Sequence, residues 1–129
     1  VSNALQSLVD YPQTFLAAAG IEAPGIMQGV NQWPVWLGQT EKVRDHALVE
    51  NRHNPTTVHL RTLVTDRYKI TVYRNADYGE LFDLETDPNE LHNRWDDPAY
   101  AGVKSDLLHR FAQAEIQRES TRMPRIAGA

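Results

Sequence analysis

The sequence predicts an α+β fold, in which a small antiparallel sheet of about four strands is covered on one face by a long C-terminal helix. Residues 58–84 contain short segments in which apolar and polar side chains alternate, which is the period of a half-buried strand. Residues 98–119 instead carry an apolar residue every three or four positions, as an amphipathic helix does. The members of this helical stripe are Tyr100, Val103, Leu107, Phe111 and Ala114.

An N-terminal helical segment precedes the predicted sheet. Pro12 suits the first turn of a short helix, and Gly20 is placed to end it in the left-handed conformation. Phe15, Leu16 and Ala19 would form the apolar face of this helix. After a loop rich in Pro and Gly, an apolar cluster is expected around a helical turn that ends at Gly38; its members are Trp33, Trp36 and Leu37. Residues 39–45 are polar and are expected to form an exposed linker.

The predicted strands follow one another along the chain. Residues 47–50 are expected to be a buried strand, and residues 51–56 a polar loop. The alternating segments 58–64 and 68–73 would pair through a turn at residues 65–67, and residues 80–84 would add a fourth strand. Such a meander keeps one face of the sheet in water.

The segment Glu80–Asn93 is expected to run from the last strand directly into a capped turn of helix. Asp87 has the position of an N-cap, Pro88 the first helical position, and Glu90 lies three residues after the cap. Asp97 before Pro98 is the expected cap of the C-terminal helix. This physical interpretation makes the segment a structural corner without chemistry.

The same segment resembles a signature near the C-terminus of sulfatases, Glu-Leu-Tyr-Asp-Leu-x-x-Asp-Pro-x-Glu-x-x-Asn, with Phe82 in place of Tyr. Residues 8–21 are similar to the sulfatase segment Val-Asp-x-x-Pro-Thr-Leu-Leu…Ala-Gly-Ile, from which Gln13 departs as an insertion. Residues 28–30 with 36–38, and residues 61–69, resemble two further segments in the order of that family. The chain is therefore identified as a C-terminal portion of a sulfatase of the alkaline phosphatase superfamily.

The resemblance implies a division of the chain and a function for a longer parent protein. Residues 1–38 would belong to the large sulfatase domain, and residues 39–129 would be the C-terminal subdomain that braces it. The parent would hydrolyse a sulfate ester with a formylglycine nucleophile, made from Cys or Ser in the pattern Cys/Ser-x-Pro-x-Arg, and a calcium ion. This chain has no Cys, and none of its four Ser residues has that pattern. We therefore expect no catalytic residue and no metal ligand here, and no activity from the chain alone.

Two alternatives remain open at this stage. Related C-terminal domains occur in phosphonate and phosphate ester hydrolases of the same superfamily, where the nucleophile (formylglycine or Thr) would discriminate. The chain could also be a free-standing binding or assembly module without catalysis. The reading frame upstream of Val1 would separate a fragment of an enzyme from such a module.

Candidate binding residues gather after the first predicted strand. Arg52, His53, His59 and Arg61 place cationic and hydrogen-bonding groups where the resemblance implies the rim of the substrate pocket. Guanidinium and imidazole groups can hold a sulfate ester, which is an anion. The alternative is a solvated loop with an exposed cross-strand pair. A metal site at His46, His53 and His59 is disfavoured, because their spacings match no standard ligand pattern.

The composition limits the kinds of partner that this chain can have. The 129 residues carry a net charge of −4, which argues against nucleic acid. No apolar run approaches the ~20 residues of a membrane helix. The expected partners are the missing catalytic domain, a sulfated small molecule or sugar in the parent, and a second copy when the domain is isolated. The compartment stays open between periplasmic or secreted and cytoplasmic.

Overall fold

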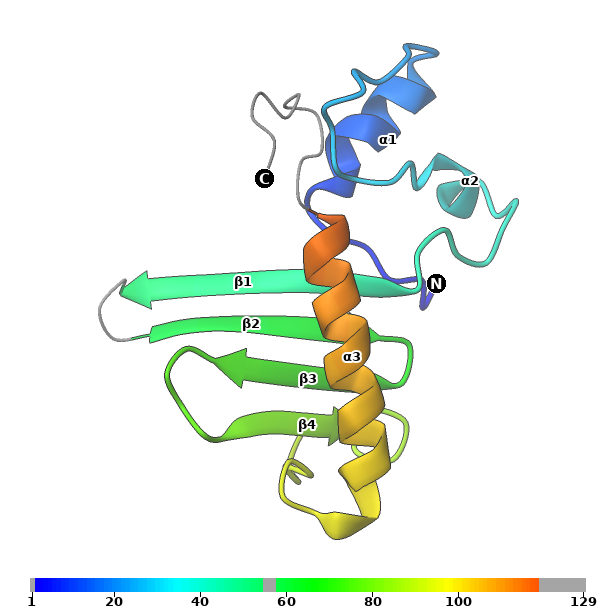
Figure 1. The fold of residues 1–129 in the computed structure, drawn as a ribbon. Helices are drawn as coiled ribbons and strands as arrows, with labels where there is room; N and C mark the ends of the chain where they lie inside the picture. Colours follow the sequence, from blue (N-terminus) through cyan, green and yellow to red (C-terminus); the bar gives the residue numbers. More distant parts are fainter. Residues whose placement is uncertain (1, 55–57, 119–129) are drawn as a thin grey trace.

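The fold of the chain is an α+β arrangement in which one helix crosses a four-stranded sheet (Figure 1). The computed structural model describes residues 2–54 and 58–118, the side chains of residues 53 and 54 excepted. In chain order the elements are α1 (Asp10–Ala18), α2 (Trp33–Trp36), β1 (His46–Asn54), β2 (Val58–Thr65), β3 (Tyr68–Tyr73), β4 (Gly79–Asp83), a 3₁₀ turn η1 (Pro98–Tyr100) and α3 (Ala101–Gln117). The predicted fold class is confirmed.

The sheet is a simple antiparallel meander in the order β1-β2-β3-β4. Its register places Leu48 opposite Leu63, Leu63 opposite Ile70, and Ile70 opposite Leu81, so one row of side chains crosses all four strands. α3 lies over this row (Figure 1). Because side chains alternate between the two faces of a strand, neighbouring residues such as Val49 and Val64 lie on the opposite face, the back of the sheet.

The core lies between this row and the apolar stripe of α3. Leu107, Phe111 and Ala114 are buried against Leu63, Ile70 and Leu81, while Tyr100 and Val103 pack at the edge. The predicted stripe is therefore confirmed. Asp97 caps this helical segment as predicted. Its side chain accepts a hydrogen bond from the Ala99 amide in η1, the 3₁₀ turn that leads into α3. No helix in the described part of the chain is both long and apolar enough to cross a membrane.

Residues 2–38 form a separate N-terminal unit beside one end of the sheet (Figure 1). α1 ends where predicted, with Gly20 in the left-handed conformation (φ 71°), and α2 ends in the same way at Gly38 (φ 70°). Gly29 passes so close to α1 that an added Cβ would lie 2.0 Å from the carbonyl oxygen of Val9. Whether residues 1–38 belong to a different domain from residues 39–129 stays a prediction.

Two local predictions were wrong. β1 is the edge strand of the sheet and not a buried strand, and Val49 is 51% exposed. The Asp87 segment forms a turn and not a helix, because Glu90 adopts a left-handed conformation (φ 55°). Asp87 nevertheless accepts backbone hydrogen bonds from the amides of Leu91 (3.1 Å) and His92 (2.8 Å), so it caps a loop.

Candidate functional site

The structure brings three of the four predicted binding residues together. Arg52 lies on β1, and His59 and Arg61 lie on β2. β1 continues to Asn54, so residues 51–54 are strand and not the predicted loop. Arg52 Nε donates a hydrogen bond to His59 Nε2 at 3.1 Å, which leaves the proton of a neutral His59 on Nδ1. The side chain of His53 lies outside the described residues.

Glu50 is the centre of the ionic contacts in this region. Its carboxylate pairs with Arg52, lies 3.6 Å from Arg61 and lies 3.5 Å from Arg118. Burial raises the pKa of Glu50, but the three guanidinium groups outweigh it and hold that pKa below its usual value. Glu50 is therefore a permanent anion at neutral pH.

A second carboxylate reaches the same cluster from α3. Glu115 pairs with Arg61 and also with Arg118, whose Nε lies 2.9 Å from the Glu115 carboxylate. Two carboxylates thus face three guanidinium groups, those of Arg52, Arg61 and Arg118, before any charge on His59 is counted. The cluster has a surplus of positive charge. Of the three Arg side chains, that of Arg52 is the most exposed at 54%.

An open groove of about 520 Å³ begins at this cluster and runs between the sheet and α3. Its walls are mainly apolar, with cationic side chains along the rim. The lining residues are His59, Leu60, Arg61, Val72, Tyr73, Arg74, Leu108, Phe111, Ala112 and Glu115. Burial, followed by the hydrogen bond from Tyr73 to Glu80 (3.0 Å), raises the pKa of Tyr73 to about 12, so this phenol stays neutral. The groove can therefore hold a ligand that has an apolar face and a negative group.

Metal chemistry finds no support in this part of the chain. Within residues 2–54 and 58–118, no group of three or more His, Asp or Glu side chains could hold a metal ion. His46 does not approach His59, because it contacts Asp45 (2.6 Å) and pairs with Thr65 at the opposite end of β2. A calcium ion of the kind the resemblance implies would need ligands from elsewhere.

Sequence reasoning missed two members of the cluster, Glu115 of α3 and Arg118, which directly follows this helix. Glu115 and Arg118 are more than 50 residues away from Arg61 along the chain, and only the packing of α3 brings them to β2. One signal was present: Glu115 lies four residues after Phe111, so it flanks the buried stripe on the same side of the helix.

Residues 1–117 match the family described as N-sulphoglucosamine sulphohydrolase, C-terminal. The chain belongs to this family of sulfatase C-terminal domains. The sequence-based resemblance to a sulfatase is thus confirmed, over all but the last 12 residues of the 129.

Curated relatives of this domain are much longer than the chain. It is 26% identical to an N-acetylglucosamine-6-O-sulfatase of Bacteroides thetaiotaomicron over 123 residues, which are 90% of this chain and 22% of that protein. It is 33% identical to an uncharacterised sulfatase of Escherichia coli over 102 residues, 78% of this chain and 20% of that protein. The chain therefore spans about a fifth of the length of each of these two relatives.

Solved structures share the fold. One, determined in complex with its substrate D-glucosamine-2-N,6-O-disulfate, is 26% identical with a TM-score of 0.74, over 84% of this chain and 23% of the other. The phosphonate monoester hydrolase of Agrobacterium radiobacter gives a TM-score of 0.68 over 84% of this chain and 24% of the other. Its 24% identity shows a common fold alone.

Proposed function

We propose that this chain is the C-terminal domain of a sulfuric ester hydrolase and that its charged groove binds an anionic part of the substrate, a sulfated sugar. The observation that carries the proposal is the positive surplus around Glu50, with Arg52 at its exposed edge. Membership of this family supports a sulfate ester as substrate, and the named activity of a relative, an N-acetylglucosamine-6-O-sulfatase, supports a sugar.

Arg52 is the residue best suited to contact the substrate. A guanidinium can donate two parallel hydrogen bonds to a sulfate or carboxylate group. Glu50 pairs with Arg61 and Arg118 as well as with Arg52. Its negative charge therefore stays partly neutralised when the Arg52 side chain turns to an incoming anion. His59 supports the Arg52 guanidinium by accepting from Nε.

Arg61 has a positioning role in this proposal. It lies between Glu50 and Glu115 and connects β1 and β2 to α3. Its side chain is 30% exposed, which leaves less room for a ligand than at Arg52. Arg61 therefore fixes the two carboxylates that hold the exposed cation in place.

Catalysis belongs to the part of the polypeptide that would precede this domain. The formylglycine pattern is absent from the sequence, and the described residues offer no cluster for calcium. When bound there, calcium and formylglycine would supply sulfate coordination and the nucleophile. The residues of this chain would bind and orient the sugar and exclude water from the pocket rim.

A kinetic comparison in the full-length gene product tests the role of Arg52. Arg52→Gln should raise KM for a sulfated disaccharide about tenfold or more, the expected effect of one charge-assisted hydrogen bond, with kcat little changed. Turnover of a small activated aryl sulfate, which does not reach the groove, should stay the same. Lys42→Gln is the matched control, because the Lys42 side chain is also 54% exposed.

The same assay distinguishes this proposal from its alternatives. An Arg52→Gln enzyme that behaves like the Lys42→Gln control would show that Arg52 does not contact the substrate. Faster turnover of a phosphonate monoester than of any sulfate ester would favour the phosphonate hydrolase alternative, which a common fold leaves open. A gene product without Cys/Ser-x-Pro-x-Arg or a Thr nucleophile upstream would favour the free-standing module.

A further inference from the structure

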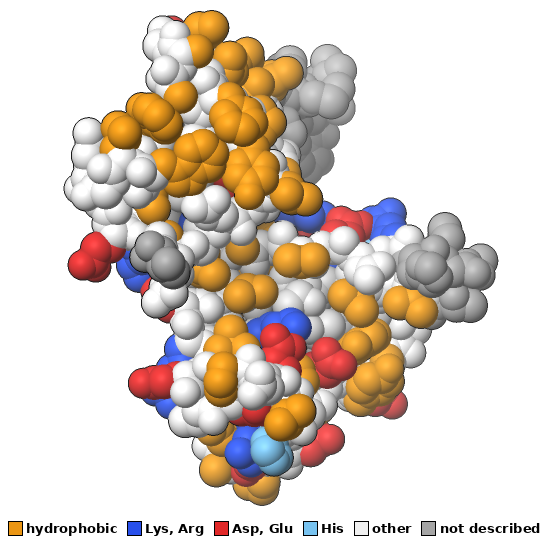
Figure 2. Space-filling view, turned by 180° about the vertical axis from the view of Figure 1, so that it is seen from behind, with side chains coloured by type: hydrophobic (Ala, Val, Ile, Leu, Met, Phe, Trp, Pro, Cys, Tyr) orange, Lys and Arg blue, Asp and Glu red, His pale blue; other side chains and the backbone are white. Residues whose placement is uncertain are grey.

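A β-bulge brings the side chain of Arg52 to His59. The β1–β2 register shifts between Asn51 and Asn54, so two residues of β1 lie opposite His59 alone. Bulges commonly re-aim a side chain next to an active site. Because the residues of a strand alternate, His59 lies on the same face of β2 as the core residue Leu63, which is the face that α3 covers (Figure 1) and that is turned away from the viewer in Figure 2.

The contact between these two side chains requires a neutral His59. Its Nε2 accepts the hydrogen of Arg52 Nε at 3.1 Å, and one nitrogen of a neutral imidazole is free to accept. Protonation places a hydrogen on both ring nitrogens, so the imidazolium and the guanidinium become two donors that face each other. Two positive charges at this distance also repel each other. The present contact is therefore incompatible with a protonated His59.

Glu50 is the anion for which the two cations would compete. Its Oε1 pairs with Arg52 and lies 3.8 Å from His59 Nε2. The pKa of Glu50 lies below its usual value, so this carboxylate stays ionised over the range of about pH 5–8 in which histidines exchange a proton. The His59 side chain is 21% exposed and that of Arg52 54%. The less exposed cation has the greater need of a counter-ion, whereas Arg52 can turn into water.

The other charged groups near His59 and Glu50 come from three elements. They are Arg61 of β2, Arg74 after β3, Glu115 of α3 and Arg118 after α3. Arg61 pairs with both carboxylates of the cluster, and so does Arg118. Within the described residues, the ion pairs of Arg52 involve Glu50 alone. Arg52 is therefore the guanidinium that the cluster holds least firmly.

We propose that His59 is a proton-operated switch of the groove: its protonation transfers Glu50 from Arg52 to His59 and frees the Arg52 guanidinium for an anion. The surplus of positive charge in the cluster then grows by one. A sulfated sugar carries permanent negative charge, so it should bind more tightly as the pH falls. By thermodynamic linkage, a bound anion favours the proton on His59 to the same extent. The inference rests on the proposed function only in naming this sugar as the anion.

Nuclear magnetic resonance of this chain tests the switch without any ligand. Overhauser contacts between the Cδ hydrogens of Arg52 and the ring of His59 should be present above the His59 titration and lost below it. The neutral ring should be the Nδ1–H tautomer, because Nε2 accepts from Arg52. His109→Gln is the matched control, since His109 is an exposed histidine of α3 that does not line the groove. This variant should keep both features.

Calorimetric binding of D-glucosamine-2-N,6-O-disulfate tests the consequence for an anion, because its sulfate groups are ionised at every pH used. The affinity of the chain should be about fivefold or more higher at about pH 5.5 than at about pH 7.5, the lower end of ordinary coupling between two sites. His59→Gln should remove this difference. His59→Lys, with a permanent charge, should bind tightly at both pH values, and His109→Gln should behave like the unchanged chain.

The outcomes separate this inference from the proposed function. Binding that Arg52→Gln abolishes but that is equal at both pH values would overturn the switch and keep the groove as a substrate site. An Arg52–His59 contact that persists once His59 is protonated would overturn the switch as well. A contact that is lost on protonation, in a chain that binds the sugar at neither pH, would remove the substrate role of the groove and leave the switch standing.

Discussion

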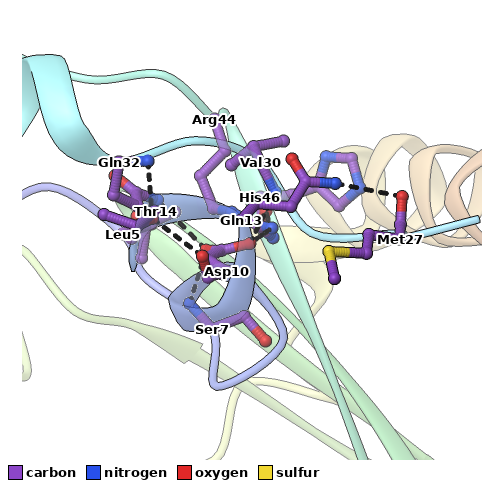
Figure 3. A network of polar contacts seen from close by, with 10 residues as sticks. All are labelled: Leu5, Ser7, Asp10, Gln13, Thr14, Met27, Val30, Gln32, Arg44 and His46. Atoms are coloured by element: carbon purple, nitrogen blue, oxygen red, sulfur yellow. Dashed lines mark hydrogen bonds and ion pairs between the residues drawn. The ribbon is translucent and has the colours of Figure 1, made fainter. Parts of the chain in front are cut away.

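Arg44 places its guanidinium against the carboxylate of Asp10, which has no exposed surface. The same carboxylate accepts from the amides of Ser7 at 2.8 Å and Val30 at 2.9 Å, and from the side chain of Gln32 at 3.1 Å (Figure 3). One buried anion thus organises the N-terminal unit and connects it to β1.

Asp10→Ala should destabilise the protein by about 3–5 kcal/mol, the usual result of removing one partner of a buried ion pair. The substitution leaves the Arg44 guanidinium, 14% exposed, without its counter-ion, and two backbone amides without an acceptor. Asp66→Ala is the control, since it breaks the exposed pair with Lys42 and should cost much less. Urea unfolding measures both. Similar losses for the two variants would contradict a structural role for Asp10.

Acid should weaken the fold through its buried carboxylates. Burial raises the pKa of Asp10, but its hydrogen bonds and Arg44 outweigh it, so the pKa lies below the ordinary 3.8. The hydrogen bonds from Arg67 lower the pKa of Asp83. A lowered folded pKa stabilises the protein fully above the ordinary value, and this contribution is lost as the pH falls through the folded pKa. The urea midpoint should therefore be level near neutrality and fall below about pH 4. A urea midpoint at pH 3 equal to the midpoint near neutrality would contradict this prediction.

The sequence predicted the sheet and α3 because both depend on periodic burial. Leu63, Ile70 and Leu81 alternate with polar neighbours, and Leu107 and Phe111 repeat at helical spacing. The corner at Asp87 was mispredicted because the local residues suit a helix cap and a capped loop equally. Tertiary contacts distinguish the two: Lys69 pairs with Glu90 at 2.5 Å, and Asn93 Oδ1 accepts a hydrogen bond from the Leu81 amide at 2.9 Å.

The candidate site was predictable only in part. Antiparallel pairing of Glu50 with Arg61 follows from the hairpin, so a cluster including Arg52 could be expected. The contacts of Glu115 and Arg118 depend on how α3 is rotated about its axis and on where it ends. The apolar stripe of the helix specifies neither. The polar interior beneath α1 was equally hidden, because Phe15 and Leu16 predict an apolar buried side.

The core prediction concerns Phe111, which is 7% exposed on the side of α3 that faces the sheet. Phe111→Ala should cost about 3–5 kcal/mol, because it removes a large buried side chain and leaves a cavity. Leu108→Ala on the same helix, at a position 37% exposed, should cost much less. Thermal or urea unfolding of the two variants is the measurement. A loss below about 1 kcal/mol for Phe111→Ala would mean that α3 is not anchored through this residue.

This chain alone should not hydrolyse sulfate esters. The sequence lacks the formylglycine pattern, and the described residues provide no calcium site. The purified chain is assayed with an activated aryl sulfate and calcium, with buffer as the reference. Calcium-dependent turnover above the buffer rate would show that the chemistry resides in this domain after all.

The last prediction is self-association of the isolated chain. The rings of Tyr11, Phe15, Trp33 and Trp36 lie together on the N-terminal unit, and Phe15 and Trp36 are 61% and 39% exposed. Burying such apolar area contributes about 25 cal/mol per Å² before association costs are subtracted. A second copy of the chain offers the same exposed apolar rings as a partner. Light scattering over a dilution series should therefore show a concentration-dependent dimer.

Variants identify the surface involved in that dimer. Phe15→Asp places a charge beside the rings of Tyr11 and Trp36 and should shift the chain to monomer. Ile116→Asp, equally exposed on α3, should leave the dimer unchanged. A strict monomer at every concentration would contradict self-association, and a dimer that resists Phe15→Asp would place the contact elsewhere.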